Sequence, residues 1–126
     1  MSNAGQRFID YDRTREVTFT VDAVENKLFT QAGALCGVGE VPYGCAIRDI
    51  DISEEGASGE VAQGVIHIGF AAAAIVAGNF VKPAASGTLT PVAADKDYYA
   101  GIAIDSQATV GGEFRYIWQP GYYAVT

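Results

Sequence analysis

Histidine, cysteine and basic side chains are scarce in this chain of 126 residues. His67 is the only histidine, and Cys36 and Cys45 are the only cysteines. A zinc site needs more cysteine or histidine ligands than this, and a catalytic serine or cysteine usually needs a histidine base. A lone histidine on an alternating strand is more typical of a packed residue. The sequence therefore indicates no enzyme, no metal site and no bound cofactor.

The two cysteines leave two structures open. Cys36 and Cys45 could form a disulfide across one hairpin. Two buried free thiols fit their apolar, glycine-rich surroundings better, because free cysteine packs as a small apolar residue. Neither alternative indicates chemistry.

Basic residues are outnumbered, with 8 Lys and Arg against 15 Asp and Glu, for a net charge of −7. A nucleic-acid groove requires clustered Lys and Arg, so a nucleic-acid partner is not expected. The longest stretch without a formal charge, residues 62–81, contains polar residues and a strand-like pattern. The N-terminus lacks the basic-then-apolar order of a secretory signal. We expect a soluble protein that does not enter a membrane.

What is abundant is apolar residues, at 49% of the chain, in short runs separated by Gly, Pro, Asp or Ser. Val17, Phe19 and Val21 alternate with threonines, which is the period-two signal of a β-strand. Turn signals then recur about every ten residues, as in a small barrel or sandwich. The fold class predicted is mainly all-β, with further strands in 33–52 on both sides of Pro42, and in 60–70, 78–84, 99–105 and 112–119.

Two segments depart from this rhythm. Ala71 to Gly78, "AAAAIVAG", predicts a single short helix, because alanine favours helices and a closing glycine ends them. Residues 1–16 are polar and nearly charge-balanced, with too little apolar surface to order alone. We therefore predict an extended N-terminal arm with one strand over 1–24, and a β-barrel-like domain over 25–126.

A short internal similarity suggests pseudo-symmetry. "YGCAIRD" (43–49) and "YAGIAIDS" (99–106) share Gly-x-Ala-Ile followed closely by Asp. Each is followed by a Gly-Glu pair that is expected to open a strand, at 59–60 and at 112–113. Two strand–turn–strand units built alike would suit a barrel.

The stretch from Arg48 to Glu60, "RDIDISEEGASGE", places acidic and hydroxyl side chains at the ligand spacing of a calcium-binding EF-hand loop. Such a loop also needs glycine at its sixth position and a helix on each side. Here Glu54 takes the sixth position, and both flanks have strand patterns. A solvated acidic turn is the better interpretation.

The chain resembles the head decoration, or cement, proteins of bacteriophage capsids over about residues 25–117. The similarity rests on three stretches: "GALCGVGEVPYGCAIRDIDISEEGASGEVAQGVIHI", "AAAAIVAGNFVKPAASGTLTPV" and "YYAGIAIDSQATVGGEFRYI". In that family a Gly-x-Ala segment leads through an acidic turn to a Gly-Glu that opens the next strand. The longer arm and the tail "WQPGYYAVT" depart from the family pattern.

This resemblance implies a barrel-like fold without enzymatic activity, located on the outer capsid surface of the virion. It implies the phage major capsid protein as partner, which the decoration protein stabilises by bridging its subunits, often as a homotrimer. An arm could add a strand to an exposed edge of the capsid. Seven residues of the arm and its strand are the candidate capsid contacts: Phe8, Ile9, Tyr11, Arg13, Arg15, Val17 and Phe19.

The C-terminal stretch "FRYIWQPGYY" is rich in aromatic residues. Core packing accounts for many of them, but aromatic side chains are also enriched at protein interfaces. The candidates for an oligomer interface are Trp118, Tyr122 and Tyr123. As an alternative function, the same three residues could form the platform of a carbohydrate-binding or tail-associated β module.

Overall fold

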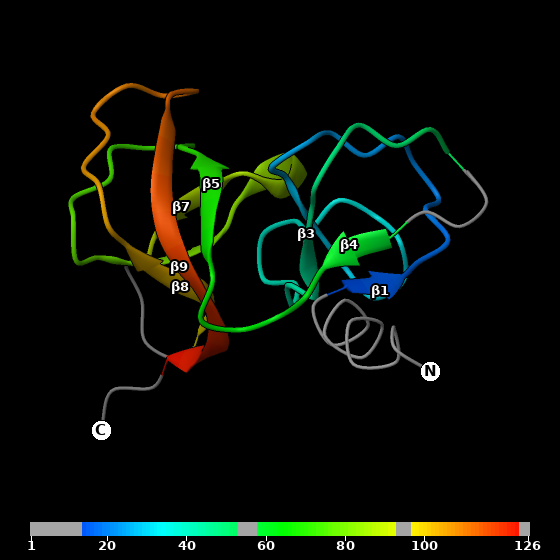
Figure 1. Ribbon diagram of the computed structural model, residues 1–126. Helices are drawn as coiled ribbons and strands as arrows, with labels where there is room; N and C mark the ends of the chain where they lie inside the picture. Colours follow the sequence, from blue (N-terminus) through cyan, green and yellow to red (C-terminus); the bar gives the residue numbers. More distant parts are fainter. Residues whose placement is uncertain (1–13, 53–57, 93–96, 124–126) are drawn as a thin grey trace, which may run out of the picture.

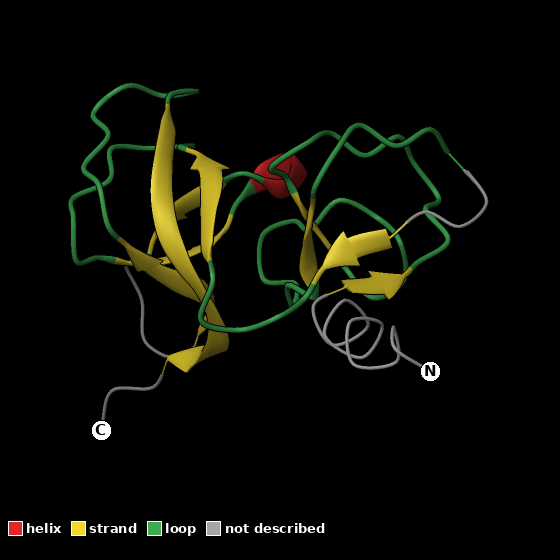
Figure 2. Ribbon diagram, viewed as in Figure 1, coloured by secondary structure: helices red, strands yellow, loops and turns green. Residues whose placement is uncertain are grey.

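The computed structural model describes residues 14–52, 58–92 and 97–123. It is built from nine short β-strands and one 3-10 turn, η1 (Ala85–Gly87). The helix drawn in red in Figure 2 is η1, and no α-helix lies within these ranges. The prediction of a mainly β fold is confirmed.

The strands form two antiparallel sheets. The first has the order β1 (Thr14–Glu16), β4 (Ser58–Glu60), β3 (Gly44–Ala46), β2 (Leu28–Phe29). The second has the order β5 (Ile66–Phe70), β9 (Glu113–Tyr123), β8 (Asp97–Ala103), β6 (Phe80–Pro83), β7 (Leu89–Pro91). In Figure 1 the two sheets form separate lobes, joined by the segment that leads from β4 to β5.

The two sheets repeat one pattern of connections. Strands β1, β2, β3 and β4 correspond in order and pairing to β5, β6, β8 and β9. The correspondence holds at the level of register. The pairs Leu28–Cys45, Cys45–Glu60 and Thr14–Glu60 match Phe80–Ile102, Ile102–Ile117 and Ile66–Ile117. Thr14 to Ile66 and Leu28 to Phe80 are shifts of 52, and Cys45 to Ile102 and Glu60 to Ile117 are shifts of 57.

The turns repeat as well. The amide of Lys27 donates to the carbonyl of Val24, and the amide of Asn79 donates to that of Val76, both at 3.0 Å. The third residue of each turn has a positive φ, 71° at Asn26 and 91° at Gly78, a conformation that asparagine and glycine tolerate best. We call residues 14–60 the first repeat and residues 66–123 the second repeat. Strand β7 has no counterpart strand in the first repeat.

The internal similarity seen in the sequence reflects this duplication in part. Gly44, Ala46 and Ile47 correspond to Gly101, Ala103 and Ile104 under the same shift of 57. The two Gly-Glu pairs do not correspond, because Gly59 matches Tyr116 in register. The second Gly-Glu does open a strand at Glu113, whereas the first lies inside β4.

Buried residues form two clusters. The first lies within the first repeat, where Val17, Phe19 and Ala23 pack against Phe29, Ala46 and Ile50. The second fills the second repeat and also includes Leu28, Cys36 and Cys45 of the first repeat. One face of the first sheet is therefore covered by residues 17–23 of the same repeat. The other face packs against the second repeat.

Two predicted elements differ in the structure. Strand β1 ends at Glu16, although Val17 and Phe19 are still buried in alternation with exposed Thr18 and Thr20. Ala71–Gly78 is not a helix. Its amides pair with other segments instead: Ala71 donates to Gly112, Ala72 to Leu89 and Ile75 to Gln107. An eight-residue run gains little from helix propensity alone, so these long-range bonds decide its conformation.

The predicted boundary between arm and domain at residue 24 falls inside the first repeat. Within the described ranges, residues 14–24 contribute β1 and three core side chains. Among all the residues that the structure describes, no helix has the length and apolar character needed to cross a membrane.

Candidate functional site

The arm residues predicted to contact a capsid are only partly covered by the structure. Phe8, Ile9, Tyr11 and Arg13 lie outside the described residues. Arg15 lies in β1, paired with Gly59 of β4, and its guanidinium donates to the carbonyl of Thr14 at 2.8 Å. Its side chain is half-buried.

Val17 and Phe19 require a correction. Both side chains are buried in the core of the first repeat, and Phe19 meets Phe29 edge to face at 5.2 Å between ring centroids. Their alternation with threonine is therefore the signature of core packing. They do not extend an exposed contact surface.

Trp118 requires the same correction. Its side chain is 0% exposed, its Nε1 donates to the carbonyl of Val61 at 3.2 Å, and its ring stacks on His67. A fully buried indole cannot serve as an oligomer contact or as a sugar platform. Tyr122 and Tyr123 pair through their backbones with Tyr98 and Asp97, and their side chains lie outside the description.

In the described part of the acidic stretch, residues 48–52 and 58–60, polar groups form hydrogen bonds that hold the turn in place. The carboxylate of Asp49 accepts a hydrogen bond from the amide of Glu25 at 2.9 Å. The carboxylate of Asp22 accepts one from the amide of Ile52 at 2.8 Å. These bonds tie the turn to the segment before β2. Among the described residues, no three His, Cys, Asp or Glu side chains come together as metal ligands.

The buried titratable groups belong to the packing between and within the repeats. Neither Cys36 nor Cys45 forms a disulfide, and both are buried, as the sequence favoured. Burial, with a smaller effect of nearby Glu40, raises the pKa of the Cys36 thiol to about 12. Burial likewise raises the pKa of Tyr116 well above its usual value. Reactive thiols are accessible and have lowered pKa values, so Cys36 is a structural residue.

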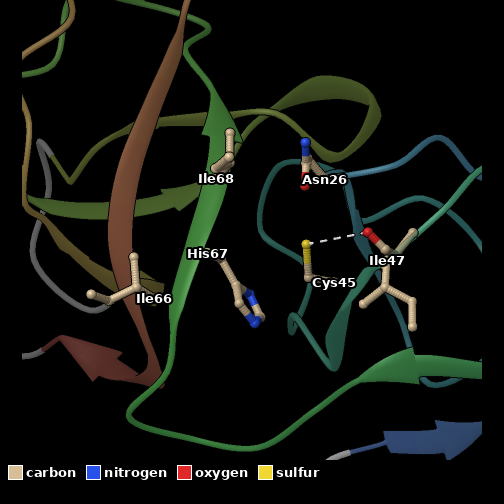
Figure 3. Close-up of a pocket in the computed structure, with 7 residues that line it drawn as sticks. Asn26, Cys45, Ile47, Ile66, His67 and Ile68 are labelled. Atoms are coloured by element: carbon tan, nitrogen blue, oxygen red, sulfur yellow. Dashed lines mark hydrogen bonds between the residues drawn. The ribbon is translucent and has the colours of Figure 1, made fainter.

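A cleft of about 270 Å³ opens between the two repeats (Figure 3). It lies between β5 and the end of β3, and its lining residues are Asn26, Cys45, Ala46, Ile47, Ile66, His67 and Ile68. Figure 3 shows the His67 side chain pointing toward Cys45, across the cleft. The thiol of Cys45 donates to the carbonyl of Ala46 at 3.7 Å.

The lining of the cleft contains no Asp, Glu, Lys or Arg, and it includes three isoleucines, Ile47, Ile66 and Ile68. His67 is mostly buried, with its ring edge to face against Tyr116. The sequence did not predict this cleft, because the lining comes from three separate segments that meet only in the folded chain.

No family model and no curated protein matches the sequence. The fold is similar to a solved structure described as the head fiber gp8.5 N base in bacteriophage phi29, with a TM-score of 0.68 and 14% sequence identity. The match covers 84% of this chain and 92% of the other. At this identity the likeness establishes a shared fold.

Proposed function

We propose that this chain is a structural virion protein that attaches to the outside of a bacteriophage head and bridges neighbouring major capsid subunits. The observation that carries the proposal is the shared fold with the base of a phage head fiber, which covers nearly all of that base. The resemblance of the sequence to capsid decoration proteins supports the same location independently. The protein then acts without catalysis and without a cofactor.

The candidate contacts are now narrower than the sequence suggested. Residues 1–13, which include Phe8, Ile9, Tyr11 and Arg13, remain the proposed capsid-binding arm, with Arg15 at its end. Val17 and Phe19 are removed from this set because they are core residues. An arm of this kind would bind by adding backbone hydrogen bonds to a sheet edge, and many copies on one shell would compensate for weak single contacts.

The experiment is a co-sedimentation of purified protein with expanded heads that lack it. The intact chain should sediment with the heads. A chain lacking residues 1–13 should fold with an unchanged circular dichroism spectrum and remain in the supernatant. The truncation stops at residue 13 because Thr14–Glu16 form β1, whose loss would disturb the first sheet. Equal sedimentation of the two proteins would overturn the role of the arm.

The carbohydrate-binding alternative keeps only Tyr122 and Tyr123 of its three platform residues. Stacking of a sugar requires an exposed aromatic face, and the indole of Trp118 lies in the core.

A further inference from the structure

The cleft between the two repeats runs along the edge of a strand. Three consecutive residues of β5, Ile66, His67 and Ile68, line it. Successive side chains of a strand point to opposite faces of the sheet, so one cleft meets all three only if it lies beside the strand. β5 is the end strand of the second sheet, and Figure 1 shows it on the side of β9 nearer to the first repeat. The outer edge of β5 therefore faces the cleft.

The hydrogen bonds between β5 and β9 show which backbone groups point to that edge. The amide of Trp118 donates to the carbonyl of Val65 at 2.8 Å, so this carbonyl points toward β9. Alternate residues of an antiparallel strand direct their N–H and C=O groups to the same side. The N–H and C=O groups of Ile66 and Ile68 therefore point away from β9. They present two donors and two acceptors at the spacing of a β-ladder.

Two other end strands have this kind of edge covered by the chain itself. At β2, the carbonyl of Leu28 accepts from the amide of Cys36 at 2.9 Å. At β7, the carbonyl of Leu89 accepts from the amide of Ala72 at 2.7 Å. Among the described residues β5 pairs only with β9, and its Ile66 is 60% exposed. Of these three edges, the edge of β5 is the one open to a further strand.

The lining of the cleft determines which side chains such a strand would carry. Its isoleucines, Ile47, Ile66 and Ile68, are all exposed. Residues placed opposite Ile66 and Ile68 would lie beside them on the same sheet face, where β-branched apolar pairs are favourable. The residue opposite His67 would project toward the first repeat, where Cys45 lies across the cleft. A small uncharged side chain fits that position.

We propose that the edge of β5 binds an extended segment of another protein, which adds to the second sheet as a further strand. The addition is antiparallel, as are the other pairings in this sheet. The segment carries β-branched apolar residues opposite Ile66 and Ile68, with a small uncharged residue between them. Backbone hydrogen bonds supply the affinity, and the alternate side chains supply the selectivity.

The chain's own arm does not have this pattern. Its stretch Ile9-Asp10-Tyr11 would bring a carboxylate against a lining without Lys or Arg. Burial of an unpaired charge is costly, so a segment of a different protein is the better occupant. The inference does not depend on attachment to a phage head.

The first test uses the end-blocked peptide Lys-Thr-Val-Ser-Val-Thr-Lys as the probe. Its lysines keep it soluble and favour its approach to a chain of net charge −7. The intact chain should bind it saturably in an NMR titration. Amide exchange at Ile66 and Ile68 should be fast in the free protein and about tenfold slower or more in the complex. The amide of His67, which points toward β9, should exchange slowly in both.

Two results of this titration would overturn the proposal. One is the absence of binding. The other is slow exchange of Ile66 and Ile68 in the free protein, because the edge would then already be occupied by the chain itself.

Methylated peptides test the hydrogen bonds themselves. In an antiparallel ladder the two valines would exchange backbone bonds with Ile66 and Ile68, whereas the N–H groups of the two threonines would point away from β5. N-methylation of both valines should weaken binding about tenfold or more. N-methylation of both threonines adds the same two methyl groups and should change the affinity by less than about twofold. Equal affinity of the two methylated peptides would contradict strand addition.

A variant of the protein removes the same contact from the other side. Ile68→Pro deletes the N–H at the edge and leaves the bonds to β9 in place, and edge strands accept proline at such positions. It should bind the peptide about tenfold more weakly. Ile68→Ala shortens the side chain but keeps the N–H, so it should weaken binding by about threefold or less. Unchanged binding by a folded Ile68→Pro would place the peptide elsewhere and overturn the proposal. The methylated peptides decide the question on the intact chain even where Ile68→Pro fails to fold.

Discussion

Asp49 and Ser106 hold the same hydrogen bond in the two repeats. The carboxylate of Asp49 accepts from the amide of Glu25, and the hydroxyl of Ser106 accepts from the amide of Ala77, each at 2.9 Å. Asp49 and Ser106 differ by 57 positions and the two amides by 52, the same shifts that relate the strands. The duplication therefore extends to individual side-chain contacts. It assigns the acidic stretch a role in fastening a turn.

The first prediction concerns this contact. Asp49→Ala should lower the free energy of unfolding by about 1 kcal/mol, because the amide of Glu25 loses its acceptor. Asp49→Ser should destabilise the protein less than Asp49→Ala does, since Ser106 accepts the same hydrogen bond at the equivalent position. Urea denaturation followed by circular dichroism measures both. Asp51→Ala is the control, an exposed neighbour that should change stability by less than about 0.5 kcal/mol. Equal effects of Asp49→Ala and Asp51→Ala would argue against the contact.

The second prediction uses the positive-φ turns. Gly78→Asn should leave stability within about 0.5 kcal/mol, because Asn26 adopts a similar φ in the equivalent turn. Gly78→Val should cost about 1–2 kcal/mol or more, since a β-branched side chain is strained at positive φ. No other group lies near the position where a Cβ would be added at Gly78, so crowding should not obscure the comparison. Thermal melting of the two variants should separate them clearly. Similar melting temperatures would contradict the equivalence of the turns.

The third prediction concerns the close approach of β8 to β9. A Cβ at Gly101 would meet the carbonyl oxygen of Ile117 and the ring of Tyr116. Gly101→Ala should therefore destabilise the chain by about 2–4 kcal/mol, because two paired strands must move apart. Ala103→Gly, two residues along the same strand, should cost about 1 kcal/mol. Denaturant titration measures both, and a stable Gly101→Ala protein would contradict the packing described.

The fourth prediction follows from the Cys36 thiol. With a pKa raised to about 12, this group stays protonated in the folded protein at pH 7–9. Labelling by a thiol-specific reagent at pH 8 should be slow in the folded state and rapid in denaturant.

The same pKa shift gives a pH dependence of stability. The pKa of Cys36 in the folded protein lies above the ordinary thiol value of 9.0, so its contribution to stability is fully present below pH 9. Between pH 9 and 12 the unfolded chain releases this proton and the folded chain keeps it, so stability falls as pH rises. Cys36→Ala should flatten this part of the profile. An unchanged slope in Cys36→Ala would assign the dependence to other groups.

The fifth prediction concerns Trp118, the only tryptophan. Its fluorescence should be blue-shifted in the folded protein and poorly quenched by acrylamide, because the indole is fully buried. Adding sugars should leave the emission unchanged, and unfolding should shift it to longer wavelength. Strong quenching in the folded state would reinstate Trp118 as a surface residue.

The sequence predicted strands best where alternation and burial agree. In β9, buried Phe114, Tyr116 and Trp118 alternate with more accessible Arg115 and Ile117, which is why its position could be read from the residues. The same alternation at Val17 and Phe19 was interpreted as a strand that continues a capsid-contacting arm, whereas both side chains are buried in the core and lie beyond the end of β1. Alternation reports which side is buried, and pairing depends on a partner strand that lies far along the chain.

In the sequence the duplication could be recognised only at Gly44–Ile47 and Gly101–Ile104. Most equivalent core positions carry side chains of different size in the two repeats. In the first repeat a large side chain, Phe29, fills the space opposite Gly59. In the second repeat the corresponding residues are the smaller Val81 and the larger Tyr116. Core volume can be preserved by such compensation while sequence similarity is lost. The cleft is lined by three segments that lie far apart in the chain, so the sequence alone could not locate it.

The most direct test of the proposed function is a reconstruction by electron cryomicroscopy of heads from a phage that encodes this chain. The account predicts density for two adjacent β-units on the outer surface of the shell, in contact with more than one major capsid subunit. Heads that carry no such density, while the protein is found elsewhere in the virion or outside it, would contradict the account.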